Sequence, residues 1–190
     1  MRTLIILGHP DKSSFCSRLA DSYEHGAKEK GGDVMRINLI DLKFDPILKS
    51  VNRPQSLEPD LMEAQRLIKW ANHLVFVFPV WWSAPPALLK GFIDRIFLPN
   101  FAFKLRENSS MWDKLLTGRS ARMIMTSDAP VVWLHLAYFH PAVNMMKKAT
   151  LEYCGVGPVS VTNFGSMKRA DEKKRSVLLD KVYREGLQDN

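Results

Sequence analysis

Two loops contain the side chains whose types could do chemistry, and the first is "HPDKSSF", residues 9–15. Ser13 and Ser14 stand where a helix would begin, so two hydroxyls, free backbone N–H groups and the helix dipole could converge on one anion. A phosphate would fit such a site, with His9 beside it. The plainer alternative is that one serine only caps the helix and that His9 is a turn residue facing solvent. This stretch taken alone favours the alternative.

The second loop is "FPVWWSAPP", residues 78–86, which places two bulky rings where most turns have small polar residues. Trp81 and Trp82 could offer a flat apolar wall with N–H groups at its edge, against which a planar three-ring ligand could stack. Such stacking contributes about 0.5 to 1.5 kcal/mol per aromatic pair beyond the burial of area. The adjacent prolines stiffen the loop and reduce the entropy lost on ordering it. Alternatively, one tryptophan fills the core and the other makes a dimer contact.

Neither loop belongs to a nucleotide-binding or metal-binding motif. The chain has no GxGxxG or GxxxxGK(S/T) sequence, and its two cysteines, Cys16 and Cys154, stand in no CxxC or zinc-like spacing. We therefore expect reduced thiols and no metal site.

The elements that position these loops follow from the hydrophobic pattern. Short apolar runs, typical of strands buried on both faces of a parallel sheet, alternate with segments whose apolar residues recur at helical spacing. The apolar runs predict strands at 3–9, 33–40, 73–80, 119–127 and 156–165. The helical patterns predict helices within 13–32, 58–72, 85–97, 141–155 and 168–186. No repeat or linker interrupts the series, so we expect one domain over residues 1–190.

The alternation of strands and helices predicts an α/β fold, a three-layer sandwich in which a parallel sheet has helices on both faces. Five strands suit the flavodoxin-like order 2-1-3-4-5 better than a six-stranded dinucleotide-binding fold. Ligands of such sheets bind beyond the carboxyl ends of the strands where the order reverses, here strands one and three. The two loops follow these strands, so we expect them to line one crevice.

Composition and charge exclude several classes of protein. No apolar run approaches the roughly 20 residues that span a bilayer, and the first apolar stretch is too short for a signal peptide, so we expect a cytoplasmic protein. The formal net charge is +7, but Lys and Arg are scattered and mixed with acids, as in residues 168–186. We therefore expect no nucleic-acid partner, although a basic surface would attract small molecules that carry phosphate.

The block "FPVWWSAPPALLKGFIDRIF" (78–97), together with "HPDKSSF", resembles the flavodoxin-like NAD(P)H:quinone oxidoreductase family. This family includes quinone reductases, drug-activity modulators and the ancillary oxidoreductases of potassium-efflux systems. The resemblance implies a non-covalent flavin, a homodimer with the active site at its interface, and transfer of two electrons as hydride from NADH or NADPH to a quinone-like acceptor. The first loop is more similar to FAD-binding members, so we expect FAD, with FMN as the alternative.

The resemblance also implies which residues hold the cofactor. On the phosphate side of the flavin it places His9, Ser14, Phe15 and Cys16. Ser13 joins them as a candidate from its position at the start of the helix. Cys16 stands where the family commonly has Asn. Under the isoalloxazine ring it places a segment whose backbone N–H groups reach N5 and the carbonyl oxygens, formed by Pro79, Val80, Trp81, Trp82 and Ser83.

The chain departs from the family after the fourth strand. The family usually has Thr-Thr-Gly-Gly there, whereas this chain has Thr126, Ser127, Asp128 and Ala129. Loss of both glycines removes the closest approach of the backbone to the ring and adds a carboxylate. We therefore expect a different shape of the substrate pocket, with the three residues 126–128 still beside the flavin.

The catalytic residues implied by the resemblance are a Tyr and a His from the loop 126–143, which compensate negative charge near N1 and O2 of the reduced flavin. Tyr138 and His140 are the candidates by position. An imidazole there could stabilise the developing charge and give a proton to the departing hydroquinone. Alternatively, Tyr138 packs with Trp133 and Phe139, His140 only precedes a helix, and His135 takes the second role.

Two other functions stay open. The protein could be a regulatory flavoprotein that docks on a membrane transporter, since a basic surface would suit a docking face, with its reductase activity incidental. It could also be a one-electron carrier of the flavodoxin type. Flavodoxin-type carriers, however, have a different phosphate loop, which is rich in Thr and Gly, and they tend to be acidic. This chain is basic and lacks that loop.

Overall fold

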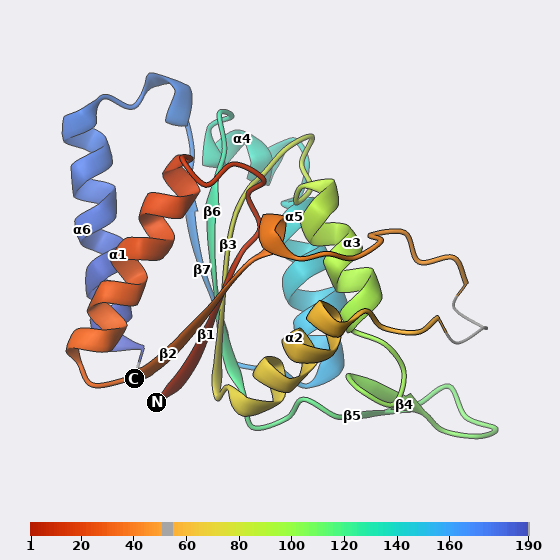
Figure 1. Ribbon diagram of the computed structural model, residues 1–190. Coiled ribbons are helices and arrows are strands. Elements are labelled where there is room, and N and C mark those ends of the chain that lie inside the picture. The colour runs from red at the N-terminus through yellow and green to blue at the C-terminus, as the bar shows by residue number, and fades with distance from the viewer. Residues whose placement is uncertain (51–54, 190) are drawn as a thin grey trace.

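The computed structural model describes residues 1–50 and 55–189, and its centre is a five-stranded parallel sheet (Figure 1). The strands of this sheet are β1 Arg2–Leu7, β2 Asp33–Asn38, β3 His73–Pro79, β6 Ser120–Thr126 and β7 Val159–Phe164. They correspond to the five predicted apolar runs, and they lie in the order β2-β1-β3-β6-β7. The α/β fold and its five-stranded parallel sheet are confirmed.

The predicted strand numbering is wrong beyond the third strand, because the sequence analysis missed a small hairpin. Its strands, β4 Phe103–Leu105 and β5 Trp112–Lys114, pair antiparallel and form a separate sheet. They raise the numbers of the next two strands, so the predicted order 2-1-3-4-5 becomes 2-1-3-6-7. Each hairpin strand is only three residues long and contains charged side chains, so no apolar alternation marks it.

Helices cover both faces of the sheet (Figure 1). On one face lie α1 Phe15–Glu29 and α6 Glu172–Gln188, drawn in red and blue. On the other face lie α2 Pro59–Trp70, α3 Ala87–Ile96 and α5 Pro141–Val143, the last of which continues as a π-helix, Asn144–Glu152. Within the described residues, no helix has the length and apolarity that a membrane crossing requires.

Some local details differ from the predictions. β1 ends at Leu7, so His9 lies in the loop and not at the end of the strand. Helix α6 begins later than predicted, because a 3-10 turn, Met167–Arg169, precedes it. The expected loop over 126–143 contains a further short helix, α4 Val131–Leu136. The π-helical winding after α5 was not predicted, since nine residues of wider winding are too few to distinguish from an α-helix by the hydrophobic pattern.

The core forms two clusters, one on each side of the sheet. Along β1, the side chains of Leu4 and Ile6 enter one cluster and those of Ile5 and Leu7 enter the other. Every residue of β3 is buried. This explains the continuous apolar runs of the sequence, because each side chain of a central parallel strand points into one of two helix layers.

Helices α1 and α6 touch through their backbones, and this contact requires a glycine on each. A Cβ atom on Gly26 would lie 2.1 Å from the carbonyl oxygen of Tyr183, and one on Gly186 would lie 2.3 Å from that of Tyr23. Side-chain rotation cannot relieve a clash with a backbone atom. The two glycines therefore set the distance between the helices.

We expect Gly26→Ala and Gly186→Ala each to lower the free energy of unfolding by about 2 kcal/mol, because the helices must separate to admit a methyl group. Helix propensity acts in the opposite direction, favouring alanine by about 1 kcal/mol, so a loss of stability reports the steric contact. Urea unfolding followed by circular dichroism measures the change. Ser176→Ala, at an exposed position of α6, is the control and should not be destabilised. Unchanged stability in both glycine variants would contradict the close contact.

Candidate active site

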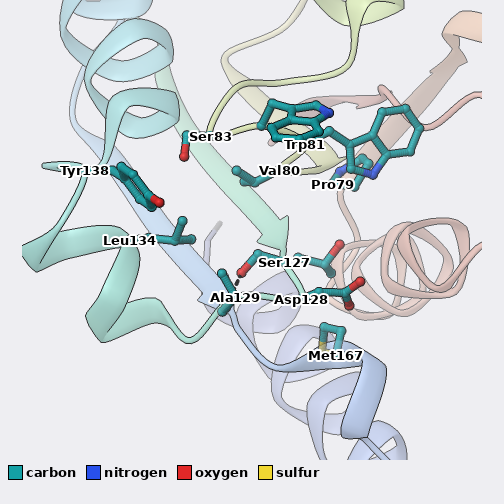
Figure 2. A pocket seen from close by; sticks show the side chains of 12 residues that line it. Pro79, Val80, Trp81, Ser83, Ser127, Asp128, Ala129, Leu134, Tyr138 and Met167 are labelled. Atoms are coloured by element: carbon teal, nitrogen blue, oxygen red, sulfur yellow. Dashed lines mark hydrogen bonds between the residues drawn. The ribbon is translucent and has the colours of Figure 1, made fainter.

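A pocket of about 870 Å³ opens at the carboxyl ends of β3 and β6 (Figure 2). Its volume lies in the range of roughly 300 to 1,000 Å³ that is usual for small-molecule sites. The residues that line it are Pro79, Val80, Trp81, Trp82, Ser83, Thr126, Ser127, Asp128, Ala129, Leu134, Tyr138 and Met167. The structure thus brings together every predicted cofactor-binding residue of the segments 79–83 and 126–128, and it adds Tyr138 to them. It does not bring the predicted residues after β1 into the lining.

The segment after β3 leaves the sheet through a tight turn. Trp81 and Ala84 exchange two backbone hydrogen bonds, of 2.8 and 2.9 Å. Between them, Trp82 and Ser83 both have positive φ, 51° and 61°. Turns of this kind favour Asn and Gly, because other residues cost about 1 to 3 kcal/mol in a left-handed conformation. The mouth of the pocket therefore stores backbone strain.

The two tryptophans of this turn both lie at the surface. Trp82 is fully exposed, and Trp81 is 45% exposed. Neither ring fills the core, so that part of the alternative interpretation is wrong. The Trp81 ring meets the ring of His9 edge-on, with 5.6 Å between centroids. A flat ligand in the pocket could cover the exposed indole surface.

The loop after β1 ends in the capped start of α1. Ser14 is the N-cap, and its hydroxyl oxygen accepts a hydrogen bond from the N–H of Ser17 at 3.3 Å. Ser13 donates its hydroxyl to Asp11 at 2.8 Å. The expectation that a serine caps the helix is confirmed. A cap satisfies only part of the first turn, so the remaining N–H groups keep their capacity to bind an anion.

Two contacts join this loop to the pocket, the His9–Trp81 ring contact and one made by Cys16. The Sγ atom of Cys16 lies 3.3 Å from Oγ1 of Thr126. Burial raises the pKa of the Cys16 thiol to about 11, so the thiol is neutral at pH 7 and is not an activated nucleophile.

His9 is held as a neutral ring. Burial lowers its pKa below the usual value of a histidine, since an imidazolium is less well solvated there. Its Nδ1 accepts a hydrogen bond from the N–H of Asp11 at 2.9 Å. The proton of the neutral ring is therefore on Nε2, which can donate to a ligand.

The loop after β6 is fastened to its neighbours on both sides. The N–H of Val80 donates to the carbonyl of Thr126 at 2.7 Å, and the N–H of Ser127 donates to that of Phe164 at 2.8 Å. The Ser127 hydroxyl donates to the carbonyl of Ala129 at 2.9 Å. The carboxylate of Asp128 makes no hydrogen bond or ion pair within residues 1–50 and 55–189. It is therefore free to meet a ligand.

Tyr138 and His140, the predicted catalytic pair, lie in different places. Tyr138 lines the pocket, about half exposed, and packs edge-on against Trp133 with 6.4 Å between ring centroids. The aromatic packing considered from the sequence is thus present, but it leaves Tyr138 in the pocket. His140 lines a neighbouring cavity of only about 10 Å³, which it shares with Ser83 and Leu134.

His140 is a partly buried ring on a left-handed backbone. Its φ is 49°, and that of the exposed Phe139 before it is 55°. The pKa of His140 is lowered, first by burial and then by His135, whose ring centroid lies 5.1 Å away. Neither histidine lines the pocket. Of the three candidates, the structure brings only Tyr138 to it.

Three lining residues were missed by the sequence analysis, and these are Ala129, Leu134 and Met167. Leu134 belongs to α4, which was not predicted. Met167 follows β7, and a signal for it existed, because the loop after the fifth strand ends at the same edge of the sheet.

The sheet and the pocket together define a class of protein. The strand order reverses between β1 and β3, and the pocket opens at the carboxyl edge, where doubly wound α/β proteins of flavodoxin topology bind ligands. The chain belongs to the family with the flavodoxin-like fold, whose sequence profile matches residues 1–184.

Similar proteins are named as oxidoreductases. An uncharacterized NAD(P)H oxidoreductase of Haemophilus influenzae is 28% identical over 186 residues, or 95% of this chain and 91% of the relative. NAD(P)H dehydrogenase (quinone) 1 of Cavia porcellus is 28% identical over 180 residues, or 81% of this chain but only 64% of the relative. The crystal structure of a Streptococcus mutans protein, 30% identical, superposes with a TM-score of 0.85 and covers 99% of this chain and 100% of that one. The predicted family resemblance is confirmed.

We expect Ser83→Gly to raise the free energy of unfolding by about 0.5 kcal/mol, because glycine adopts positive φ without the steric cost that serine bears. The gain is limited by the greater entropy of glycine in the unfolded chain. Urea unfolding measures it. Ser110→Gly, at an exposed loop position without positive φ, is the matched control and should lose stability slightly. If both variants lose the same amount, the turn is not strained.

Proposed function

We propose that the protein is a flavin-dependent NAD(P)H oxidoreductase that passes two electrons, as hydride, from NADH or NADPH to a quinone-like acceptor. The observation that carries this proposal is the pocket at the carboxyl ends of β3 and β6, where an exposed indole wall faces a polar loop and Tyr138. A bound flavin accepts and donates hydride, so the protein itself needs to supply only binding, orientation and charge.

The residues of the pocket fit an isoalloxazine ring. The segment 79–81 supplies an apolar wall. The backbone N–H groups of Trp82 and Ser83, and those of Asp128 and Ala129 in the other loop, find no acceptor among the described residues. Unpaired donors beside an apolar wall are what the ring nitrogens and carbonyl oxygens of a flavin require.

The start of α1 is the proposed site of the flavin phosphate. His9 offers an Nε2–H donor, Ser14 offers a hydroxyl hydrogen, and the first helical turn offers backbone N–H groups. Two guanidinium groups, of Arg18 and Arg175, lie 5.6 and 5.2 Å from the ring centroid of Phe15. These cations support a phosphate at this helix end. We propose FAD as the cofactor, with FMN as the alternative.

Asp128 distinguishes this pocket from those of other family members, which usually have Thr-Thr-Gly-Gly in the loop after β6. Its carboxylate makes a negative charge more costly in the pocket, because like charges repel, and this repulsion grows once a bound flavin displaces water. Its oxygens could accept a hydrogen bond from a hydroxyl of the acceptor. Asp128 would therefore favour neutral quinones over acceptors that carry an anionic group.

Tyr138 is the residue we propose for stabilising charge that develops during the reaction. Its ring reaches the pocket from the segment between α4 and α5, and its hydroxyl is a hydrogen-bond donor. His140 shares a small cavity with Ser83 and Leu134 and does not line the main pocket. Its contribution is therefore expected to be smaller, although it stays a candidate for the proton donor.

A homodimer with the pocket at its interface is part of the proposal. The helix α4 and the residue after Tyr138 present exposed apolar side chains next to the pocket, and these are Val132, Trp133, Leu136 and Phe139. Clustered exposed apolar side chains of this kind mark interaction surfaces. A second copy of the chain covering them would also close the mouth of the pocket.

Titration with FAD and with FMN, followed by tryptophan fluorescence, tests the cofactor. We expect binding to quench the fluorescence, and Trp81→Ala to weaken binding several-fold, which corresponds to a stacking loss on the order of 1 kcal/mol. Trp70→Phe, at the end of α2, is the control and should bind like the wild type. A protein that shows neither quenching nor flavin absorbance would refute the proposed function.

Stopped-flow reduction of the flavin-loaded protein by NADPH tests Tyr138. We expect Tyr138→Phe to slow the reduction about tenfold with flavin affinity retained, because the variant lacks the hydroxyl donor. His140→Gln should slow it less. Tyr153→Phe is the control, since that ring stacks on Trp112, with 4.2 Å between centroids, and does not line the pocket. Equal rates in the Tyr138 and Tyr153 variants would show that Tyr138 only shapes the pocket.

A further inference from the structure

A second, smaller pocket of about 250 Å³ adjoins the first, and we call it the side pocket. Its lining residues are Asp128, Pro130, Ser166, Lys168 and Arg169. Asp128 lines both pockets, and Met167, between Ser166 and Lys168 in the chain, lines the main one. A ligand bound in the main pocket could therefore extend into the side pocket.

Lys168 and Arg169 bring positive charge to the side pocket. Within residues 1–50 and 55–189, neither side chain makes a hydrogen bond or an ion pair. Asp128 is the one carboxylate among the lining residues, so two cations face one anion there. The side pocket has a surplus of positive charge and two cations free to bind an anionic group.

The acids that follow in the chain do not neutralise these cations. Asp171 caps α6, and its carboxylate accepts the N–H of Lys174 at 2.8 Å. Glu172 pairs with Arg18, with 3.4 Å between nitrogen and oxygen. Both carboxylates already have partners of their own.

Hydrogen bonds hold the two loops of the side pocket together. The N–H of Ser166 donates to the carbonyl of Ala129 at 3.3 Å, and the N–H of Met167 donates to that of Ser127 at 3.0 Å. Gly165 permits this approach, since a Cβ atom there would lie 2.8 Å from the carbonyl oxygen of Ala129. A preformed pocket loses little entropy when a ligand binds.

We propose that the side pocket binds the 2′-phosphate of NADPH through Lys168 and Arg169, with the Ser166 hydroxyl as a further donor, so that the protein prefers NADPH to NADH. This inference rests on the proposed function. Guanidinium and ammonium groups are the side chains that recognise phosphate. A cation placed at the adenosine ribose is also a general means of distinguishing NADP from NAD.

The adenosine half of FAD is a second possible source of phosphate in the side pocket. The proposed site of the flavin phosphate, however, is the start of α1, which follows β1, whereas the side pocket follows β6 and β7. In the sheet, β3 lies between β1 and β6. The two sites are nevertheless neighbours, because α6 packs on α1 and the guanidinium of Arg175 lies 5.2 Å from the ring centroid of Phe15. The affinity for FAD is therefore measured beside that for the nucleotides, to distinguish the two sources of phosphate.

Calorimetric titration of the flavin-loaded protein with adenosine 2′,5′-bisphosphate and with 5′-AMP tests the inference without turnover. We expect the bisphosphate to bind at least about tenfold more tightly, and the double variant Lys168→Ala/Arg169→Ala to lose this difference, since a charge-assisted hydrogen bond contributes about tenfold in affinity. In the same variant kcat/KM should fall at least about tenfold for NADPH and stay unchanged for NADH.

The control is Lys30→Ala/Lys148→Ala, which removes the same charge from two exposed positions away from both pockets. It should keep the preference for the bisphosphate. An equal loss in this control would assign the effect to net charge and overturn the inference.

Three further outcomes separate the proposals. If the Lys168/Arg169 variant loses affinity for FAD but still discriminates between the two nucleotides, the side pocket holds the cofactor and the inference is wrong. Equal binding of the two nucleotides by the wild type also overturns it. A protein that binds no flavin refutes the proposed function, whereas a flavoprotein that uses NADH and NADPH equally refutes only this inference.

Discussion

The parallel pairing of β1, β3, β6 and β7 is the constraint on which the rest of the molecule depends. It brings loops that are distant in the chain to one edge, and it continues past the ends of the strands. The N–H of Val80 bonds to the carbonyl of Thr126, and that of Ser127 bonds to Phe164. A register shift of one residue would turn every buried side chain of a strand to the opposite face. The pocket is therefore positioned by the same register that positions the core.

The same edge concentrates backbone strain. The described non-glycine residues with positive φ include five that lie there, and these are Trp82, Ser83, Phe139, His140 and Ser166. Each is disfavoured by about 1 to 3 kcal/mol, so the packing around it must hold it in place. In return, the turn after β3 leaves the N–H groups of Trp82 and Ser83 without an acceptor in the described chain. The strained turn thus lowers local stability but presents two backbone N–H donors that a ligand can use.

The sequence predicted the main sheet because a central parallel strand such as β3, buried along its whole length, has an apolar side chain at nearly every position. The ligand edge then followed from topology. The three-residue strands of the hairpin and the six-residue helix α4 were not predictable, since so few residues show no period. The position of His140 depends on the left-handed backbone at 139 and 140, and a Phe-His pair gives no sign of it.

A site built around a cofactor needs shape and charge more than a reactive side chain of its own. In the proposed function, the exposed indole of Trp81 and the hydroxyl of Tyr138 would meet this need in the main pocket, and the two free cations would meet it in the side pocket. Asp128 lies at the boundary between them. NADPH, whose 2′-phosphate would be drawn toward the cations and repelled by this carboxylate, would have one favourable direction across the two pockets. The charge pattern would therefore orient NADPH as well as select it. The apolar wall, away from the cations, would contact the uncharged acceptor.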